Sequence, residues 1–223
     1  MELDFGLTAG HLAYLGFLLQ FFAYLARDEL RLRLLMLSGS AAFLLYHYLH
    51  SGAAISEIFL STAGLALTNL FMISIVVMER TTLGMSERDK ALFARFDMLT
   101  PGQFRRLLKR GTVRKAGTET VLMQDGAASE RLFFIHEGRV RIVKSGQETP
   151  ASAGIFIGEV AFLTSKPATA TVMAEPGTEY LEWDSAVLRK LMKKRPKFRV
   201  ALSAQFNSDL VRKVASSLPN PGL

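Results

Sequence analysis

Few side chains in this sequence have the types and spacing that catalysis requires. The 223 residues include no cysteine, which excludes disulfide frameworks, thiolate zinc sites, iron–sulfur clusters and a cysteine nucleophile. No Walker-type phosphate loop, zinc-ligand spacing or nucleophile elbow is present. His136 lies in a β-rich run with no serine or cysteine beside it, which favours a structural role. We therefore expect a protein that is not an enzyme and that holds no cofactor and no metal.

Positive charge is concentrated near residue 195, in Arg189, Lys190, Lys193, Lys194, Arg195, Lys197 and Arg199. Nucleic acid is one partner for such a run. The sequence ends at Leu223, however, and we expect no helix-turn-helix to follow and no nucleic acid partner. An anionic lipid surface is a second interpretation, and a solvated basic face is a third.

Residues 1–78 differ in charge from the rest of the chain. They contain three of the 27 Lys and Arg and five of the 20 Asp and Glu. Residues 5–26, 34–56 and 58–78 contain no charged side chain at all. Each run forms about 30 Å of helix, which matches the hydrocarbon layer of a bilayer. The sequence therefore predicts a transmembrane domain over residues 1–80, with three helical spans at about 6–26, 33–50 and 55–78, rather than a buried all-α core.

The positive charges of the short joints predict the orientation of these spans. Arg27, Arg31 and Arg33 lie between the first and second runs, and Arg80 follows the third. The N-terminal end and the joint after the second run contain no Lys or Arg. The positive-inside rule then places the N-terminus outside and the C-terminal domain in the cytoplasm, in a multi-pass protein of the inner or plasma membrane.

Polar residues inside the spans are candidates for function. Gln20 and Asn69 are expected to form hydrogen bonds between helices, because three spans without a buried charge make a poor pore. His47 and His50 lie three residues apart near Glu57, a spacing compatible with a metal. Interfacial histidines are more common than metal ligands, so no metal site is predicted.

After a linker and helix start at residues 81–91, residues 92–216 predict an α+β domain. Ser86 and Thr100 have the positions of helix N-caps. Turn pairs such as Asp125-Gly126 and Glu137-Gly138 separate short β-rich runs, which indicates an antiparallel roll or barrel. The predicted strands are 118–124, 131–136, 139–144, 154–157, 169–174 and 179–183. Two C-terminal helices follow, with a break at Pro196, and a tail at 217–223.

An apolar stripe with a spacing of four residues marks the last helix: Phe198, Leu202, Phe206, Leu210 and Val214. This stripe either packs on its own roll or pairs with a second chain. Small residues beside Phe206 suit close approach of two helices, so a homodimer interface is predicted here.

The roll with its flanking helices resembles the cyclic-nucleotide-binding domain over roughly residues 92–216. The segments that carry the resemblance are Gly117, Asp125-Gly126, 132–142, 158–163 and 167–172. Three spans before such a domain are similar to the Popeye-domain family, in a shorter form, with further echoes at 26–30, 104–107, Trp183 and 209–214. The Asp-Ser-Pro-Glu motif expected of vertebrate-type Popeye domains is replaced here by Ile157-Gly158-Glu159-Val160.

The resemblance implies a ligand site in the segment 158–171. Gly158 would let the backbone approach the ligand, the amides of the short helix after it would face an anion, and the Glu159 carboxylate would accept a hydrogen bond from a ribose hydroxyl. The implied ligand-binding residues are Gly158, Glu159, Val160, Ala161, Lys166, Ala168, Thr169, Ala170 and Thr171.

One position departs from the general family. The arginine that grips the cyclic phosphate there corresponds to Ala168. A charged hydrogen bond contributes about 1.5–3 kcal/mol, so affinity should fall about ten- to a hundredfold. Lys166, Thr169 and Thr171 could compensate in part. The resemblance implies a membrane-anchored sensor of cyclic AMP, signalling through its C-terminal helices and dimer contacts. The alternative is a nucleotide-free roll that acts as a membrane scaffold for protein or lipid partners.

Overall fold

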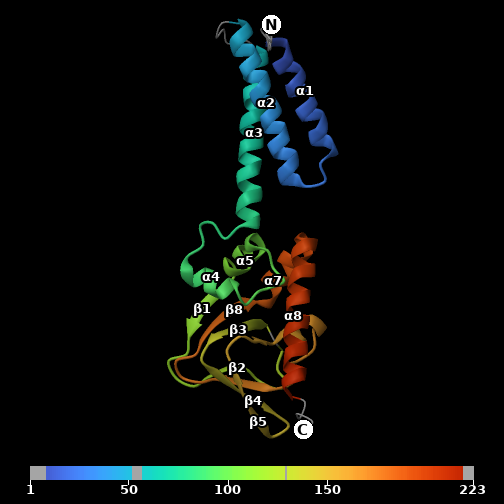
Figure 1. Ribbon diagram of the computed structural model, residues 1–223. Helices are drawn as coiled ribbons and strands as arrows, with labels where there is room; N and C mark the ends of the chain where they lie inside the picture. The colour runs from blue at the N-terminus through green and yellow to red at the C-terminus, as the bar shows by residue number, and fades with distance from the viewer. Residues whose placement is uncertain (1–8, 52–56, 129, 218–223) are drawn as a thin grey trace, which may run out of the picture. The chain divides into compact units, whose positions relative to one another are not determined.

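The computed structural model describes residues 9–51, 57–128 and 130–217 (Figure 1). The chain divides into two compact units, Met1–Thr81 and Thr82–Leu223. The beginning of the first predicted span, the start of the third, and the tail after residue 217 lie outside the described residues. The side chain of His50 lies outside them too.

The first unit consists of three helices, α1 (Ala9–Leu25), α2 (Glu29–Ser51) and α3 (Glu57–Arg80). Helices α1 and α2 approach closely where two glycines face each other. A Cβ atom on Gly16 would lie 2.9 Å from the Phe43 ring and 3.1 Å from the Gly39 carbonyl oxygen. A Cβ atom on Gly39 would in turn lie 2.9 Å from the Gly16 carbonyl oxygen. Small residues at a helix crossing are typical of helix packing in membranes.

The apolar side chains of these helices point outward. Phe17, Phe71 and Leu67 are exposed by 60%, 64% and 67%. Residues 29–49 of α2 and the whole of α3 are long and apolar enough to cross a membrane, and only 11% of an 18-residue apolar window in each is buried. The described part of α1 is apolar but only 17 residues long. The second and third predicted spans therefore meet the requirement for length and composition, and the first predicted span is not confirmed.

Polar contacts link the ends of these helices. The Asp28 carboxylate accepts hydrogen bonds from the N–H groups of Leu30 and Arg31, which caps α2, and pairs with Arg80 at 2.8 Å. The Arg80 guanidinium, followed by the Arg31 N–H, holds the pKa of Asp28 below its ordinary value. Asn69 is buried in α3 and its side-chain oxygen accepts from Arg33 of α2 at 3.5 Å. This contact joins two helices, as the sequence predicted for Asn69.

The second unit is a β-roll of two four-stranded antiparallel sheets. One sheet has the order β1-β8-β3-β6 and the other β2-β7-β4-β5. The strands are β1 (Thr112–Lys115), β2 (Thr120–Met123), β3 (Arg131–Glu137), β4 (Arg139–Lys144), β5 (Gln147–Ser152), β6 (Phe156–Ile157), β7 (Thr171–Ala174) and β8 (Glu179–Asp184). The predicted strands all occur, while β1 and β5 were missed because their side chains are mostly exposed and polar.

Five helices belong to this unit: α4 (Glu87–Phe93), α5 (Pro101–Leu108), α6 (Glu159–Thr164), α7 (Ser185–Lys194) and α8 (Pro196–Ser217). Ser86 caps α4 by accepting from the Asp89 N–H. Thr100 and Gln103 form a full capping box at α5. Helix α8 begins at Pro196, so this proline starts the last helix, as expected where an N–H would lack a partner.

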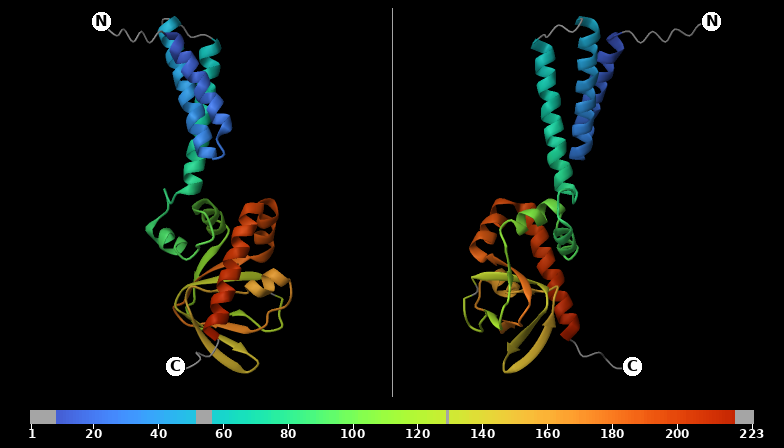
Figure 2. Two further views of the ribbon diagram at one scale, coloured as in Figure 1. Left: turned by 45° about the vertical axis from the view of Figure 1, so that its right-hand side comes forward. Right: turned by 90° about the vertical axis from the view of Figure 1, so that its left-hand side faces the viewer.

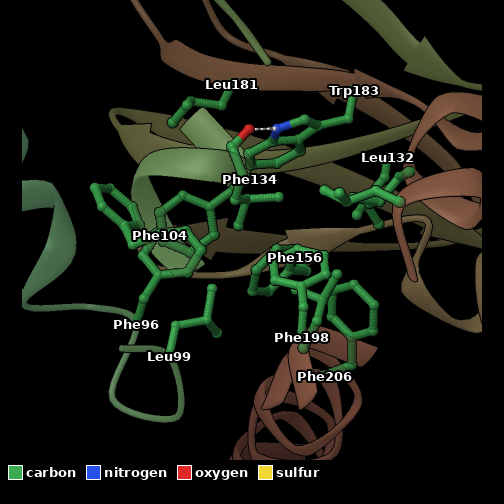
Figure 3. Packing of buried hydrophobic residues seen from close by; sticks show 14 of the residues in the cluster. Phe96, Leu99, Phe104, Leu132, Phe134, Phe156, Leu181, Trp183, Phe198 and Phe206 are labelled. Carbon is green, nitrogen blue, oxygen red and sulfur yellow. Dashed lines mark hydrogen bonds between the residues drawn. The ribbon is translucent and has the colours of Figure 1, made fainter. Parts of the chain in front are cut away.

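Two hydrophobic cores stabilise the second unit, and strand β3 supplies both. Phe133 and Ile135 point into the roll, whereas Leu132 and Phe134 point to the core between the roll and the helices. The latter core is rich in aromatic rings (Figure 3), and the Trp183 indole donates to the Leu107 carbonyl oxygen at 2.9 Å.

The stripe on α8 packs mainly within its own domain. Phe198, Leu202 and Phe206 have 1% or less of their surface exposed and belong to the core between roll and helices. The structure thus places these three residues of the predicted dimer interface in the core, because their rings and methyl groups cover Phe156 and its neighbours. Leu210 is partly exposed and Val214 is 59% exposed, so only this end of the stripe offers surface to a second chain.

Candidate functional site

The segment between β6 and β7 lines a cavity of about 190 Å³ inside the roll. Gly158 has φ +88°, in the left-handed region that favours glycine, and helix α6 starts directly after it. The walls are formed by α6 and by residues of β2, β4, β6, β7 and α8: Met123, Ile142, Lys144, Ile157, Gly158, Glu159, Val160, Ala161, Ala168, Thr169, Ala170, Val172 and Lys213.

Seven of the nine residues implied by the resemblance line this cavity: Gly158, Glu159, Val160, Ala161, Ala168, Thr169 and Ala170. The other two do not. Lys166 is exposed and lies outside the cavity lining. The Thr171 hydroxyl accepts a hydrogen bond from the Asp125 N–H at 3.0 Å, and so holds the end of β2. Neither residue therefore takes, within the cavity, the place of the arginine that the general family has at the position of Ala168.

Glu159 is paired inside the domain. Its side chain is 6% exposed, and its Oε1 atom lies 2.6 Å from the Nζ atom of Lys213 on α8. The same Nζ atom lies 3.0 Å from Oδ2 of Asp209, whose side chain is fully buried. Arg212 adds a second positive charge, at 3.2 Å from Oδ1 of Asp209. Two carboxylates and two cations therefore form a closed cluster at the cavity, with the charges balanced.

The cluster also holds the backbone of strand β6, which leads into the segment 158–171, called the cassette below. The Phe156 N–H donates to Asp209 at 3.1 Å, and the Phe156 carbonyl oxygen accepts from Lys213. Helix α8 runs along the side of the roll in both views of Figure 2. The last turns of α8 therefore contact both β6 and Glu159.

The sequence reasoning missed Lys213 and Lys144, the two cations in the cavity lining. Lys144 ends strand β4, and nothing in the local pattern directs its side chain inward. For Lys213 a signal existed. Asp209 follows Phe206 by three residues on the buried face of α8, and a carboxylate at such a place requires a partner, which Lys213 supplies four residues later.

Comparison with known proteins agrees with this architecture. Residues 113–195 match the family model described as the cyclic nucleotide-binding domain. No curated protein matches the chain. Among solved structures, a candidate cyclic nucleotide-binding protein of Geobacter metallireducens GS-15 is 15% identical, with a TM-score of 0.52, over 58% of this chain and 98% of its own.

Two further solved structures have lower TM-scores. The catabolite activator protein of Thermus thermophilus is 21% identical over 55% of this chain and 60% of its own, with a TM-score of 0.45. The regulatory domain of Toxoplasma gondii PKA, solved with cAMP, is 18% identical over 49% of this chain and 46% of its own, with a TM-score of 0.43. Residues 113–195 thus match the cyclic nucleotide-binding domain, and the unit Thr82–Leu223 that contains them has the fold of such a domain.

Proposed function

We propose that the protein is a membrane-anchored sensor of a cyclic nucleotide, with cyclic AMP as the first candidate, similar in design to the Popeye-domain proteins. The observation that carries this proposal is the cavity of about 190 Å³ lined by residues 158–161, with the Glu159 carboxylate buried beside it. The Popeye type is favoured by the order of the chain, in which apolar helices precede the roll. The role is regulatory rather than catalytic.

The membrane anchor is supported by the surface of the first unit. A helical unit whose apolar side chains face outward on all three helices would aggregate in water, but it is stable in lipid. The proposed topology has the N-terminus outside and Arg27 and Arg80 at the cytoplasmic surface. Full-length protein that remains in the membrane fraction after an alkaline wash supports this proposal, and protein released by the wash contradicts it.

The site offers a hydrogen bond to the ribose of a nucleotide, but it has no arginine for the cyclic phosphate. Glu159 would accept from a ribose hydroxyl, and Thr169 lies in the same wall. Ala168, which is 4% exposed, presents only a methyl group where the general family has an arginine. We therefore expect binding about ten- to a hundredfold weaker than a site with the arginine would give.

We propose that ligand binding changes the contacts of α8 through Lys213. A ribose hydroxyl at Glu159 competes with the ammonium group for the same carboxylate, which loosens the tie between the cassette and the end of α8. Hydrogen exchange measures this effect. Added cyclic AMP should raise amide exchange in residues 210–217 while residues 198–206 remain protected by the core. Uniform protection of both segments would contradict the coupling.

Calorimetric titration of cyclic AMP and cyclic GMP into residues 82–223 tests the sensor directly. Saturable heat that is lost in Glu159→Ala and kept in Glu137→Ala supports the proposal, since Glu137 is 66% exposed and is not among the residues that line the cavity. Emission from Trp183, the one tryptophan of the chain, shows that each variant is folded. Absence of heat from the folded fragment at millimolar ligand contradicts the proposal.

A nucleotide-free scaffold is the second candidate, and the pairing of Glu159 favours it. A carboxylate that already has an ammonium partner stabilises an empty roll. In that case the domain would bind a protein or lipid partner, and the unfolding midpoint would not change with nucleotide. A homodimer through α8 stays a prediction for either function, restricted to Leu210, Val211 and Val214, and the molecular mass of residues 82–223 in solution tests it.

A further inference from the structure

We propose that the exposed cations around the joint of α7 and α8 form a docking surface for anionic lipid headgroups of the bilayer. The basic surface consists of Lys190, Lys193, Lys194, Arg195, Lys197 and Arg199, all of which are exposed. Arg189 is not part of it, because its guanidinium lies over the Phe162 ring at 4.6 Å and donates to Ser165.

The two helices fold so that these cations point away from the domain. On α7, Leu188, Leu191 and Met192 are buried, and the lysines occupy the opposite face. On α8, Phe198 and Leu202 are buried and the cations at the start of the helix remain outside. The packing of α7 and α8 thus fixes the position of the basic surface. The same two helices lie beside the cassette.

The charges of the basic surface are not neutralised by the protein. The sequence contains no Asp or Glu between Asp184 and Asp209. Within the described part of the chain, none of the six cations lies within ion-pair distance of a carboxylate. Helix-dipole stabilisation accounts for Lys193 and Lys194 in the last turn of α7, but it does not account for the cations that follow.

A second acid-free segment lies in the same unit. No Asp or Glu occurs between Asp97 and Glu119, and exposed Lys109 and Arg110 follow α5. The bond from the Trp183 indole to the Leu107 carbonyl oxygen holds the end of α5 beside the start of α7. The positive field therefore extends beyond the six residues of the basic surface.

A bilayer is favoured over nucleic acid by the length of chain that joins the two units. Six residues, 81–86, separate the end of α3 from the start of α4, and six residues reach at most about 20 Å. With α3 in the membrane, which is the part of the proposed function on which this inference rests, the domain cannot leave the lipid surface. A cation of the domain that comes within about 8–10 Å of the bilayer is attracted by anionic headgroups at physiological salt.

Vesicle binding tests the basic surface apart from nucleotide binding and membrane insertion. Residues 82–223 contain both hydrophobic cores of the unit, and the Geobacter protein has this fold over 98% of its length, so we expect the fragment to fold on its own. The fragment is expected to sediment with vesicles of phosphatidylcholine and phosphatidylglycerol, but not with phosphatidylcholine alone. Binding should weaken as salt is raised through about 0.15 M.

Charge-matched variants locate the contact. K190Q/K193Q/K194Q should weaken vesicle binding about a hundredfold, because each cation near an anionic surface contributes about fivefold. The control R114Q/K115Q/R131Q removes the same net charge from side chains that pair with strand glutamates, and it should bind like the wild type. Equal loss in both variants would assign the binding to net charge and overturn the proposal.

Two further outcomes also overturn it. One is absence of binding to anionic vesicles at about 0.15 M salt. The other is a fragment that binds duplex DNA but does not bind the vesicles. The full chain in nanodiscs gives an independent readout, with acetylation of lysines followed by mass spectrometry. Lys193 and Lys194 should be protected in anionic nanodiscs relative to neutral ones, while Lys115 reacts equally in both. Equal reactivity of all three contradicts the docking surface.

Discussion

Replacement of Lys213 by methionine tests the charge cluster that joins α8 to the cassette. Methionine keeps most of the apolar stem but removes the ammonium group that contacts Glu159 at 2.6 Å and Asp209 at 3.0 Å. The two carboxylate oxygens share one nitrogen as neighbour and so lie no more than about 5.6 Å apart. In the variant they would repel each other, with Arg212 and the Phe156 N–H as the remaining partners of Asp209.

The loss in free energy of unfolding depends on how deeply the ion pairs of Lys213 are buried. Removal of one partner from a fully buried ion pair costs about 3–5 kcal/mol. Asp209 is fully buried and Glu159 nearly so, but the Lys213 side chain is 26% exposed, which admits water to the gap. We therefore expect a loss of about 2–3 kcal/mol in the free energy of unfolding. For a domain of this size, that lowers the melting temperature by about 4–12 °C.

Urea unfolding of residues 82–223, followed by the emission of Trp183, measures the effect in a double-mutant cycle. The four proteins are the wild type, Lys213→Met, Glu159→Gln and the double variant. Loss of the Glu159 charge should cancel part of the cost of losing Lys213, with a coupling of about 1–3 kcal/mol. Lys197→Met, on the same helix but exposed, should stay within about 0.5 kcal/mol of wild type. Additivity within about 0.3 kcal/mol would refute the pairing.

Three other measurements address the cavity and the core. Ala168→Arg should tighten binding of cyclic AMP about ten- to a hundredfold in calorimetry, and an unchanged affinity would place the phosphate elsewhere. Gly111→Ala should cost about 1–3 kcal/mol of unfolding free energy in urea, because its Cβ would lie 2.5 Å from the Trp183 indole nitrogen, whereas Gly117→Ala, with open space around it, serves as a neutral control. Burial raises the pKa of Tyr180 above 10.0, so absorbance of residues 82–223, in which Tyr180 is the one tyrosine, should show a midpoint above that of the urea-unfolded fragment. Since the folded domain holds this proton more tightly, its stability should fall as the pH rises above about 10, and identical midpoints would contradict the burial.

Local chemistry made much of the fold predictable. Capping by Ser86 and Thr100 depends on neighbours three residues away, so the sequence alone located α4 and α5. Glycines in the turn pairs have positive φ, as at Gly126 and Gly138, and they marked the strand ends. Strand β5 was not predicted because its residues are mostly exposed and include Pro150. A proline is tolerated on an edge strand but weakens the sequence pattern of a strand.

The site was predictable only where it is contiguous in sequence. Residues 158–161 form one segment, which the resemblance implied to be ligand-binding, and they line one cavity. Lys213 lies 54 positions beyond Glu159, and no spacing rule connects two residues that meet only through the packing of α8 on the roll. The stripe from Phe198 to Phe206 was equally ambiguous, because a four-residue apolar spacing fits a domain core as well as a helix partner.

Two different forces hold the two halves of α8. Phe198, Leu202 and Phe206 are fixed by apolar burial, at about 1.5–3 kcal/mol for each side chain. From Asp209 onward the helix is held by ion pairs that involve Glu159, Asp209 and Lys213. Since the apolar half cannot leave the core without loss of the fold, the proposed function implies that a ligand at Glu159 would act on the last turns of α8 alone. A partner that senses the bound state would therefore contact this end of the helix, where Val211 and Val214 are exposed by 67% and 59%.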